Sequence, residues 1–190
     1  MTSRLKLVCH GSTAALRGAA FAGDEPLDET GLRETAALAS RLGHADRYLT
    51  SPALAARQTA DALQFSAVKE PLLRGCDYGR WTGRSFADVQ AGEPEAAAQW
   101  LRDPAAAPHG GESLAEVLKR TAAWLDAQTN FIGGTVAVTH PAVIRAAVIH
   151  AIGAPPQSFW RIDIAPLSLT RLSGRGGRWT LAAMGPMKVK

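Results

Sequence analysis

The chain has 190 residues, of which 46% are hydrophobic and 20% charged, the composition of an ordinary globular domain with its own core. Its apolar runs are too short for a membrane-spanning helix, which needs about 20 residues, and the stretch before His10 is shorter than the apolar part of a secretory leader. Two cysteines, Cys9 and Cys76, supply neither a disulfide framework nor the four ligands of a structural zinc site, so we expect a soluble cytoplasmic protein.

The net charge of +4 is concentrated at the C-terminal end, because the residues after 160 sum to +5 and the first 160 to −1. Trp179 is the only aromatic residue after Trp160, whereas a nucleic-acid surface combines basic with aromatic side chains. We interpret 170–190 as a solvated basic segment, with attraction of an anionic substrate as the alternative, and expect no nucleic-acid or membrane partner. The charged residues concerned are Arg161, Asp163, Arg171, Arg175, Arg178, Lys188 and Lys190.

Up to residue 73 the pattern alternates between strand and helix. Asp28 is a good N-cap, Gly43 a helix stop, and Pro52 suits the start of a helix. Leu32, Ala36, Ala39 and Leu42 would form the apolar stripe of the first helix. The expected elements are a strand at 5–9, a loop at 11–27, a helix at 28–42, a strand at 47–50, a helix at 53–63 and a short extended piece at 68–73.

The second half begins with an irregular, glycine-rich stretch at 74–95. Ser113 and Glu116 have the spacing of a capping box, and Gly153 follows a helical pattern as its stop. The expected elements are helices at 94–101, 113–125 and 141–152, a loop at 103–111 and strands at 135–139, 159–164, 167–172 and 179–183. Strands alternating with helices predict one α/β domain over 1–190, with helices on both sides of a largely parallel sheet.

Two histidines stand where strands end: His10 after 5–9 and His140 after 135–139. Ligands of open α/β sheets bind at the carboxyl ends of the strands. Arg57 lies early in the helix after 47–50 and could point into the same crevice, or it could be a solvated helix arginine. Imidazole attacks phosphorus and guanidinium binds phosphoryl oxygens, so this set indicates phosphate chemistry.

Other chemistries are disfavoured. The sequence has no GxGxxG after a strand, no GxxxxGK[ST], no GxSxG and no HExxH, which argues against dehydrogenases, P-loop proteins, serine hydrolases and zincins. A metal site of Cys9, His10, His140 and Asp77 is disfavoured because neighbouring strand residues point to opposite faces. We expect no metal and no cofactor.

Six short motifs follow one another along the chain. They are Cys9-His10-Gly11, Leu27 to Gly31, Ser51-Pro52 followed by Ala56 to Ala60, Tyr78 to Gly83, Gly110 to Ser113, and His140 to Arg145. In this order they resemble the histidine phosphatase superfamily, in its phosphoglycerate-mutase-like branch, over about residues 5–172. The resemblance implies a three-layer α/β/α sandwich, metal-independent chemistry on a small phosphorylated metabolite, and a possible homodimer.

The resemblance also implies roles. His10 would be the nucleophile that forms a phosphohistidine, and Arg57 and His140 would hold the phosphoryl group. The candidate substrate contacts are Cys9, Gly11 and Ser12 around the nucleophile, and Glu112 in Gly-Gly-Glu-Ser. Arg145 would support the helix that follows His140.

Three positions depart from the family pattern. Cys9 replaces an arginine, Leu16 an asparagine, and Gly75 stands where the acid that protonates the leaving group is expected. Losing a charged contact or a general acid lowers rates by factors of about a hundred or more. Asp77 is the proposed stand-in for the acid, and a polar turn residue is the alternative. Arg17 or Arg84 could replace the lost guanidinium.

Two hypotheses about function follow. The first is a phosphomonoester hydrolase acting through His10, with altered or reduced activity. The alternative is a catalytically impaired family member that binds a phosphorylated or anionic ligand. The histidines and Arg57 favour the first, and Cys9 and Gly75 favour the second. A redox-sensitive pair of Cys9 and Cys76 is a further hypothesis, against two small buried residues.

Overall fold

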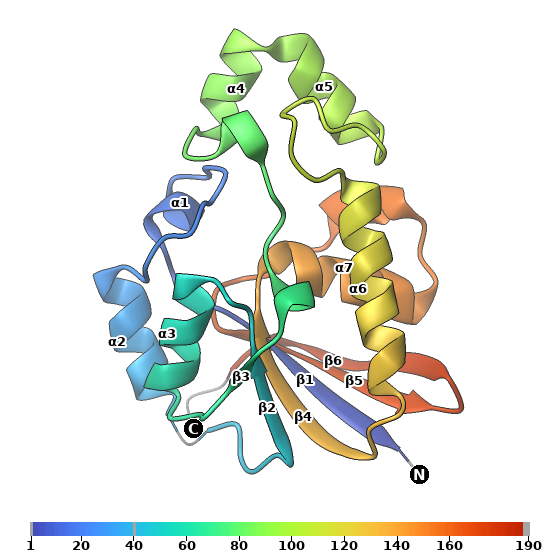
Figure 1. Ribbon diagram of the computed structural model, residues 1–190. Coiled ribbons are helices and arrows are strands. Elements are labelled where there is room, and N and C mark those ends of the chain that lie inside the picture. The colour runs from blue at the N-terminus through green and yellow to red at the C-terminus, as the bar shows by residue number, and fades with distance from the viewer. Residues whose placement is uncertain (1, 40, 188–190) are drawn as a thin grey trace.

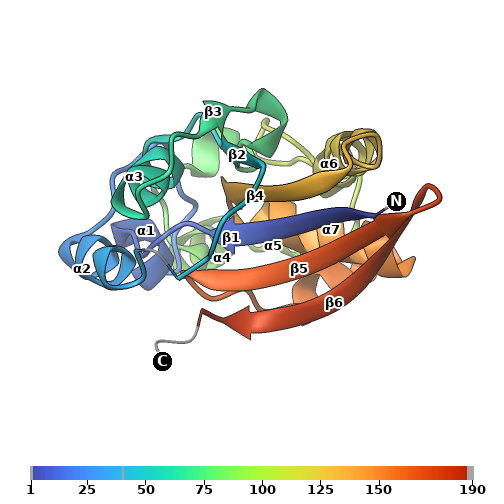
Figure 2. The same cartoon turned by 90° about the horizontal axis from the view of Figure 1, so that it is seen from below.

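The computed structural model describes residues 2–39 and 41–187, which form one six-stranded sheet flanked by helices (Figure 1). The strands are ordered β3-β2-β4-β1-β5-β6, as Figure 2 shows from top to bottom. Their bounds are β1 (Ser3–Cys9), β2 (Arg47–Thr50), β3 (Val68–Lys69), β4 (Gly133–Thr139), β5 (Ser168–Arg175) and β6 (Arg178–Pro186). The predicted α/β class is confirmed.

The four strands β3, β2, β4 and β1 are parallel, and β5 and β6 add an antiparallel hairpin at one edge. The predicted strand at 159–164 is wrong, because η3 (Pro156–Arg161) is a 3₁₀ helix there. Pro155 and Pro156 begin this turn, where a residue without an N–H is tolerated, and the Ser158 N–H donates to the Pro155 carbonyl.

Most helices begin and end where the capping residues predict, but α2 ends at Ala37, so the predicted helix stop at Gly43 is wrong. The Asp28 side chain accepts from the Gly31 N–H at 2.8 Å, Ser113 and Glu116 form the capping box, and Gly153 has a left-handed φ of 66°. The helical elements are α1 (Ala14–Arg17), α2 (Glu29–Ala37), α3 (Leu54–Ala62), η1 (Pro71–Leu73), η2 (Gly79–Trp81), α4 (Phe86–Gly92), α5 (Pro94–Arg102), α6 (Leu114–Gln128) and α7 (Pro141–Ile152).

Each face of the sheet has its own apolar core, which confirms the three-layer sandwich. On one face the sheet packs against α2 and α3, with Val136 against Ala60 in one cluster. On the other face α6 and α7 cover the sheet, and a second cluster there includes Leu7 and Val143. Side chains of successive strand residues point to opposite faces, so one strand such as β1 serves both cores.

The apolar stripe predicted for the first helix is wrong for most of its length. Leu32 is 45% exposed, Ala36 is exposed as well, and Ala39 and Leu42 lie beyond the end of α2. Gly31 faces inward instead, and a Cβ at that position would lie 2.3 Å from the Ser12 carbonyl oxygen. Backbone contact with the loop after β1 therefore decides which side of α2 is buried, and hydrophobicity alone does not show this.

The region 74–95 is less irregular than expected. It contains η2 and α4, and Ser85 caps α4 by accepting from the Asp88 N–H. We call residues 78–111 the cap; Figure 1 shows α4 and α5 at the end of the molecule remote from the N-terminus. Trp81 and Trp100 of the cap form an aromatic core together with Phe21 of the loop after α1.

The basic segment predicted at 170–190 forms part of β5 and β6 up to residue 187, with Arg171, Arg175 and Arg178 exposed. Lys188 and Lys190 lie outside the described residues. Within the described part of the chain, no helix has both the length and the apolar character to cross a membrane.

Candidate active site

The two strand-end histidines meet, as expected. Cys9 of β1 is in register with Thr139 of β4, and the His10 N–H donates to the Thr139 carbonyl at 2.9 Å. His10 and His140 therefore leave the same edge of the sheet side by side. Their ring centroids are 4.9 Å apart with an interplanar angle of 69°.

His10 is held in one tautomer by the backbone. Its Nδ1 lies 2.8 Å from the carbonyl oxygen of Gly11, which can only accept, so Nδ1 carries the proton. The ring is 3% exposed, and burial lowers its pKa against the opposing effect of the Gly11 hydrogen bond. At neutral pH Nε2 therefore has a free lone pair, as a nucleophile requires.

His140 is the N-cap residue of α7, followed by Pro141 at the first helical position. Burial, reinforced by the nearby His10 and Arg120, lowers its pKa to about 3, so the ring is neutral at physiological pH. Its Nε2 lies 2.9 Å from the Ser51 Oγ, which also accepts from the Ala53 N–H. Ser51 thus orients His140, a role that its place in the Ser51-Pro52 motif did not predict.

Both histidines line a cavity of about 780 Å³, here called the histidine cavity. Most of its wall is apolar or aromatic and comes from the loop 16–23, the cap and η3. Among the described residues, the arginines in the lining are Arg74 and Arg145, and the carboxylates are Asp24, Asp77 and Asp163. The apolar lining includes Leu16, Phe21, Tyr78, Phe86, Trp100, Leu101, Trp160 and Ile164.

Arg145 is the second residue whose place the sequence analysis missed. Its Nε donates to the Ile162 carbonyl at 2.7 Å, which ties α7 to the loop after η3, as a supporting role requires. Its charge also reaches the cavity wall, since Arg145 opposes the effect of burial on the pKa of Tyr78. Only tertiary structure could show that this helix residue lines the cavity.

Arg57 lies elsewhere, which corrects the expectation that it points into the crevice. It is not among the residues lining the histidine cavity, and its Nε donates to the Pro52 carbonyl at 3.0 Å. Counted from Ser51-Pro52, the family's arginine falls on the buried Ala55. Residue 57 lies about 200° around the helix from residue 55, so it points another way.

The proposed stand-ins for the lost guanidinium are also engaged elsewhere. Arg17 is 61% exposed and pairs with Asp28 at 3.0 Å. Arg84 pairs with Glu93 at 2.5 Å. Neither lines the histidine cavity, because nearby carboxylates hold both guanidinium groups at the surface.

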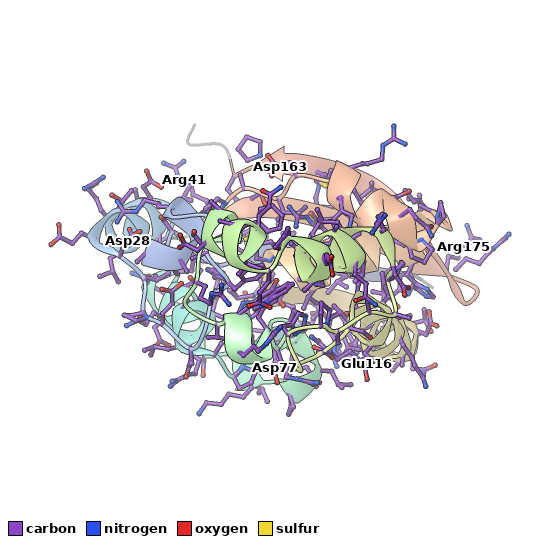
Figure 3. All side chains as sticks on the ribbon, turned by 90° about the horizontal axis from the view of Figure 1, so that it is seen from above. Asp28, Arg41, Asp77, Glu116, Asp163 and Arg175 are labelled. Atoms are coloured by element: carbon purple, nitrogen blue, oxygen red, sulfur yellow. The ribbon has the colours of Figure 1, made fainter. Side chains whose placement is uncertain are left out.

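Asp77 lines the cavity, but its carboxylate is exposed and accepts from the Gly79 N–H at 2.9 Å. This is the turn geometry of the alternative interpretation. Viewed from above, Asp77 and Asp163 lie on opposite sides of α4 and α5 (Figure 3).

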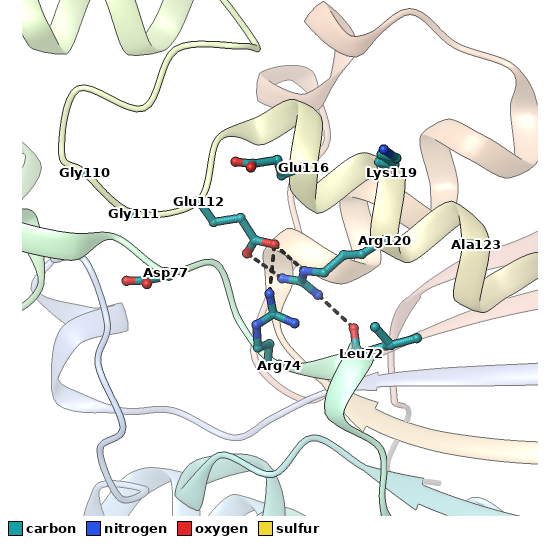
Figure 4. Close-up of a pocket in the computed structure, with 10 residues that line it drawn as sticks. All are labelled: Leu72, Arg74, Asp77, Gly110, Gly111, Glu112, Glu116, Lys119, Arg120 and Ala123. Atoms are coloured by element: carbon teal, nitrogen blue, oxygen red, sulfur yellow. Dashed lines mark hydrogen bonds and ion pairs between the residues drawn. The ribbon is translucent and has the colours of Figure 1, made fainter.

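Glu112 lies in a second cavity of about 660 Å³, here called the ion-pair cavity (Figure 4). It accepts from Arg120 at 2.6 and 2.9 Å and from Arg74 at 3.2 Å. Arg120 also donates to the carbonyls of Leu72 and Gly75. Glu112 therefore holds the segment beside the histidines and is not part of the histidine-cavity wall.

The loop after β1 contributes backbone structure. The Gly11 N–H donates to the Thr59 Oγ1 at 3.0 Å, and a Cβ on Gly11 would lie 2.8 Å from the Thr35 Oγ1. The Ser12 hydroxyl donates to Asp28 at 2.8 Å. Gly11 and Ser12 do not line the cavity, so the geometry supports a role for them in placing His10 and not in touching substrate.

The cysteines are both free. Cys9 is fully buried in the core between the sheet and the helices α6 and α7. It does not line the histidine cavity, so its predicted role as a substrate contact is wrong. Cys76 packs with a different cluster. Burial raises the pKa of each thiol to about 12, so neither is a reactive thiolate. Among the described residues, no group of three or more His, Cys, Asp or Glu side chains is arranged to hold a metal ion.

Gly75 leaves room beside the second histidine. A Cβ built on it would lie 3.2 Å from the His140 Nδ1 and 3.3 Å from its Cγ. A side chain at this position would therefore press on the ring of His140.

Comparison with known proteins places the chain in a family. The model of the histidine phosphatase superfamily (branch 1) matches residues 5–186. A bifunctional protein of Mycobacterium tuberculosis is 31% identical over 187 residues, covering 92% of this chain and 51% of that protein. The chain thus spans about half the length of the first curated relatives it matches.

Two further relatives carry specific names. Phosphoserine phosphatase 1 of Hydrogenobacter thermophilus is 30% identical over 163 residues, covering 80% of this chain and 77% of that protein. The structure of mycobacterial glucosyl-3-phosphoglycerate phosphatase is 27% identical and superposes with a TM-score of 0.80, covering 96% of this chain and 98% of that one.

Proposed function

Because the chain belongs to the histidine phosphatase superfamily (branch 1), we propose that it hydrolyses phosphate monoesters through a phosphohistidine at His10. The observation that carries the proposal is the pairing of His10 with His140 in one cavity, with the His10 Nδ1–H bound to the Gly11 carbonyl. This tautomer presents Nε2 as the nucleophile.

In the first step the His10 Nε2 attacks phosphorus and the ester oxygen leaves with its electron pair. In the second step water attacks the phosphohistidine, and the P–N electron pair returns to Nε2. His140, held by Ser51, is neutral and can donate one N–H to a phosphoryl oxygen in both steps.

The cation we assign to the phosphoryl group is Arg145, in place of the predicted Arg57. It lines the cavity, and its Nε bond to Ile162 fixes the guanidinium while leaving its other nitrogens to bind oxygen atoms. Arg74 lines the same cavity but is shared with Glu112. One cation in place of several supports the expectation of reduced activity.

The test is phosphate release from a panel of monoesters by the purified protein, beside His10→Ala. We expect kcat/KM to fall by at least about a thousandfold in His10→Ala, because the covalent route is lost. His44→Ala, which removes an exposed histidine, is the matched control. Acid-sensitive labelling of the wild-type protein but not of His10→Ala would identify the intermediate, and equal residual rates in both would reject the proposal.

The alternative of an impaired, ligand-binding relative is favoured by one observation: Arg17, Arg57 and Arg84 all lie outside the cavity lining. Calorimetric titration with inorganic phosphate separates the two hypotheses. Binding without any His10-dependent turnover would favour this alternative.

A further inference from the structure

Among the described residues that line the histidine cavity, none is placed to protonate a leaving group. Position 75, beside His140, has no side chain. The carboxylates in the lining, Asp24, Asp77 and Asp163, are all exposed to solvent, whereas a carboxyl group that stays protonated at neutral pH needs apolar surroundings. Asp24 and Asp77 in addition each accept a hydrogen bond from a backbone N–H, that of Leu54 and that of Gly79 respectively.

The remaining protic groups in the lining are poor acids. Burial raises the pKa of the Cys76 thiol to about 12, and its Sγ lies 3.4 Å from the Glu112 carbonyl oxygen. Burial also raises the pKa of the Tyr78 hydroxyl. The two histidines are neutral at neutral pH, since burial lowers the pKa of each.

The wall facing the histidines is aromatic. Phe21, Phe86, Trp100 and Trp160 all line the cavity, and the Trp100 and Trp160 ring centroids are 4.5 Å apart in an edge-to-face arrangement. Trp160 is 37% exposed and Leu101 is 41% exposed, so apolar surface reaches the opening of the cavity. Such a wall binds flat apolar rings and gives few partners to the hydroxyl groups of a sugar.

We propose that the preferred substrates are phosphate monoesters of phenols, with the aromatic ring against this wall and the phosphorus at His10. The inference rests on the proposed hydrolysis through His10 and specifies its substrate class. A phenol, with a pKa of about 10, departs as phenolate without a proton donor, whereas an alcohol resembles water, with a pKa of about 15.7.

The chemistry balances without an acid. The His10 Nε2 forms a bond to phosphorus as the P–O bond breaks, and the phenolate leaves with that electron pair and takes a proton from solvent. Water then adds to phosphorus, the P–N pair returns to Nε2, and both water protons remain on the released dihydrogen phosphate.

The experiment compares phenyl phosphate with cyclohexyl phosphate, which share a ring size but differ in the acidity of the leaving group. We expect kcat/KM for phenyl phosphate to be at least about a hundredfold higher, the usual contribution of a general acid. Across 4-nitro, 4-chloro and unsubstituted phenyl phosphates, kcat/KM should rise with the acidity of the phenol. A phenyl-to-cyclohexyl ratio within threefold would overturn the inference.

A second measurement tests the wall. Trp160→Ala should raise KM for 2-naphthyl phosphate by about fivefold at nearly unchanged kcat, since one aromatic contact is lost. Ile152→Ala removes an exposed apolar side chain outside the cavity lining and is the control. Equal KM values in both variants would contradict the wall's role.

A third variant, Asp163→Asn, tests whether this carboxyl group donates a proton to the leaving group. Selective loss of cyclohexyl phosphate turnover would reveal such a donor and overturn the inference.

The outcomes separate this inference from the proposed function. Release of phosphate that is independent of His10 rejects the proposed function for every ester. Release that depends on His10 but shows no preference for phenyl esters rejects only the inference. Calorimetric titration of His10→Ala adds a readout without turnover, in which 2-naphthyl phosphate should bind at least about tenfold more tightly than methyl phosphate.

Discussion

The histidine cavity and the ion-pair cavity share Arg74 and Asp77 in their linings. They differ in the charge of their central side chains, which are ionised and paired in one cavity and neutral in the other. In the ion-pair cavity, Glu112 and Arg120 neutralise each other, and both side chains are 9% exposed. In the histidine cavity the two rings stay neutral because they are buried together. From this difference we infer that most charged residues of this region stabilise the cavity walls by pairing with one another. Few of them remain available to bind a substrate.

The largest effect on stability is expected from breaking the buried ion pair of the ion-pair cavity. Glu112→Gln leaves Arg120 buried without its carboxylate, and we expect a loss of about 3–5 kcal/mol in the free energy of unfolding. Urea unfolding followed by tryptophan fluorescence measures it.

Asp126→Asn is the control for this substitution, because its pair with His150 is exposed on both sides and should contribute no more than about 1 kcal/mol. Similar losses in the two variants would show that burial does not distinguish these pairs.

The second prediction concerns the free energy of unfolding at low pH, where the buried ring of His140 would have to take up a proton. The pKa of His140 is about 3 in the folded protein, below its value of about 6.5 in the unfolded chain, so between these pH values the unfolded state binds more protons. The stability contributed by the neutral ring is therefore present above pH 6.5 and falls as pH decreases towards 3, by about 1.4 kcal/mol for each pH unit.

Urea unfolding at pH 7, 6 and 5 tests this dependence. His140→Asn should flatten it, whereas His44→Asn, at an exposed position, should leave it unchanged. A slope that both variants share with the wild type would contradict the assignment to His140.

The smallest effect is expected from a substitution that changes the shape of the histidine cavity but not its charge. Gly75→Ala places a methyl group 3.2 Å from the His140 Nδ1, so the ring must move by a few tenths of an ångström. We expect kcat to fall by about tenfold with KM little changed, because catalysis is sensitive to small misplacement. Gly185→Ala meets nothing within 4 Å and is the matched control. Unchanged kcat in Gly75→Ala would show that His140 tolerates displacement.

Much of the fold could be predicted because its signals are local. The strand 47–50, the helix 141–152 and the capping box at Ser113 follow from hydrophobic periodicity and from capping residues a few positions apart. The same local reasoning failed for Leu32, which contact between α2 and the loop after β1 leaves exposed. It also failed at 159–164, where two prolines begin a 3₁₀ helix.

The sequence by itself determined that His10 and His140 follow strands, and hence that they meet at one edge of the sheet. Tertiary structure alone decided which arginine reaches them: Arg145 lines the cavity and Arg57 does not. The physical reason is that backbone periodicity acts over a few residues, whereas a long charged side chain is placed by whichever carboxylate or carbonyl lies nearest in space.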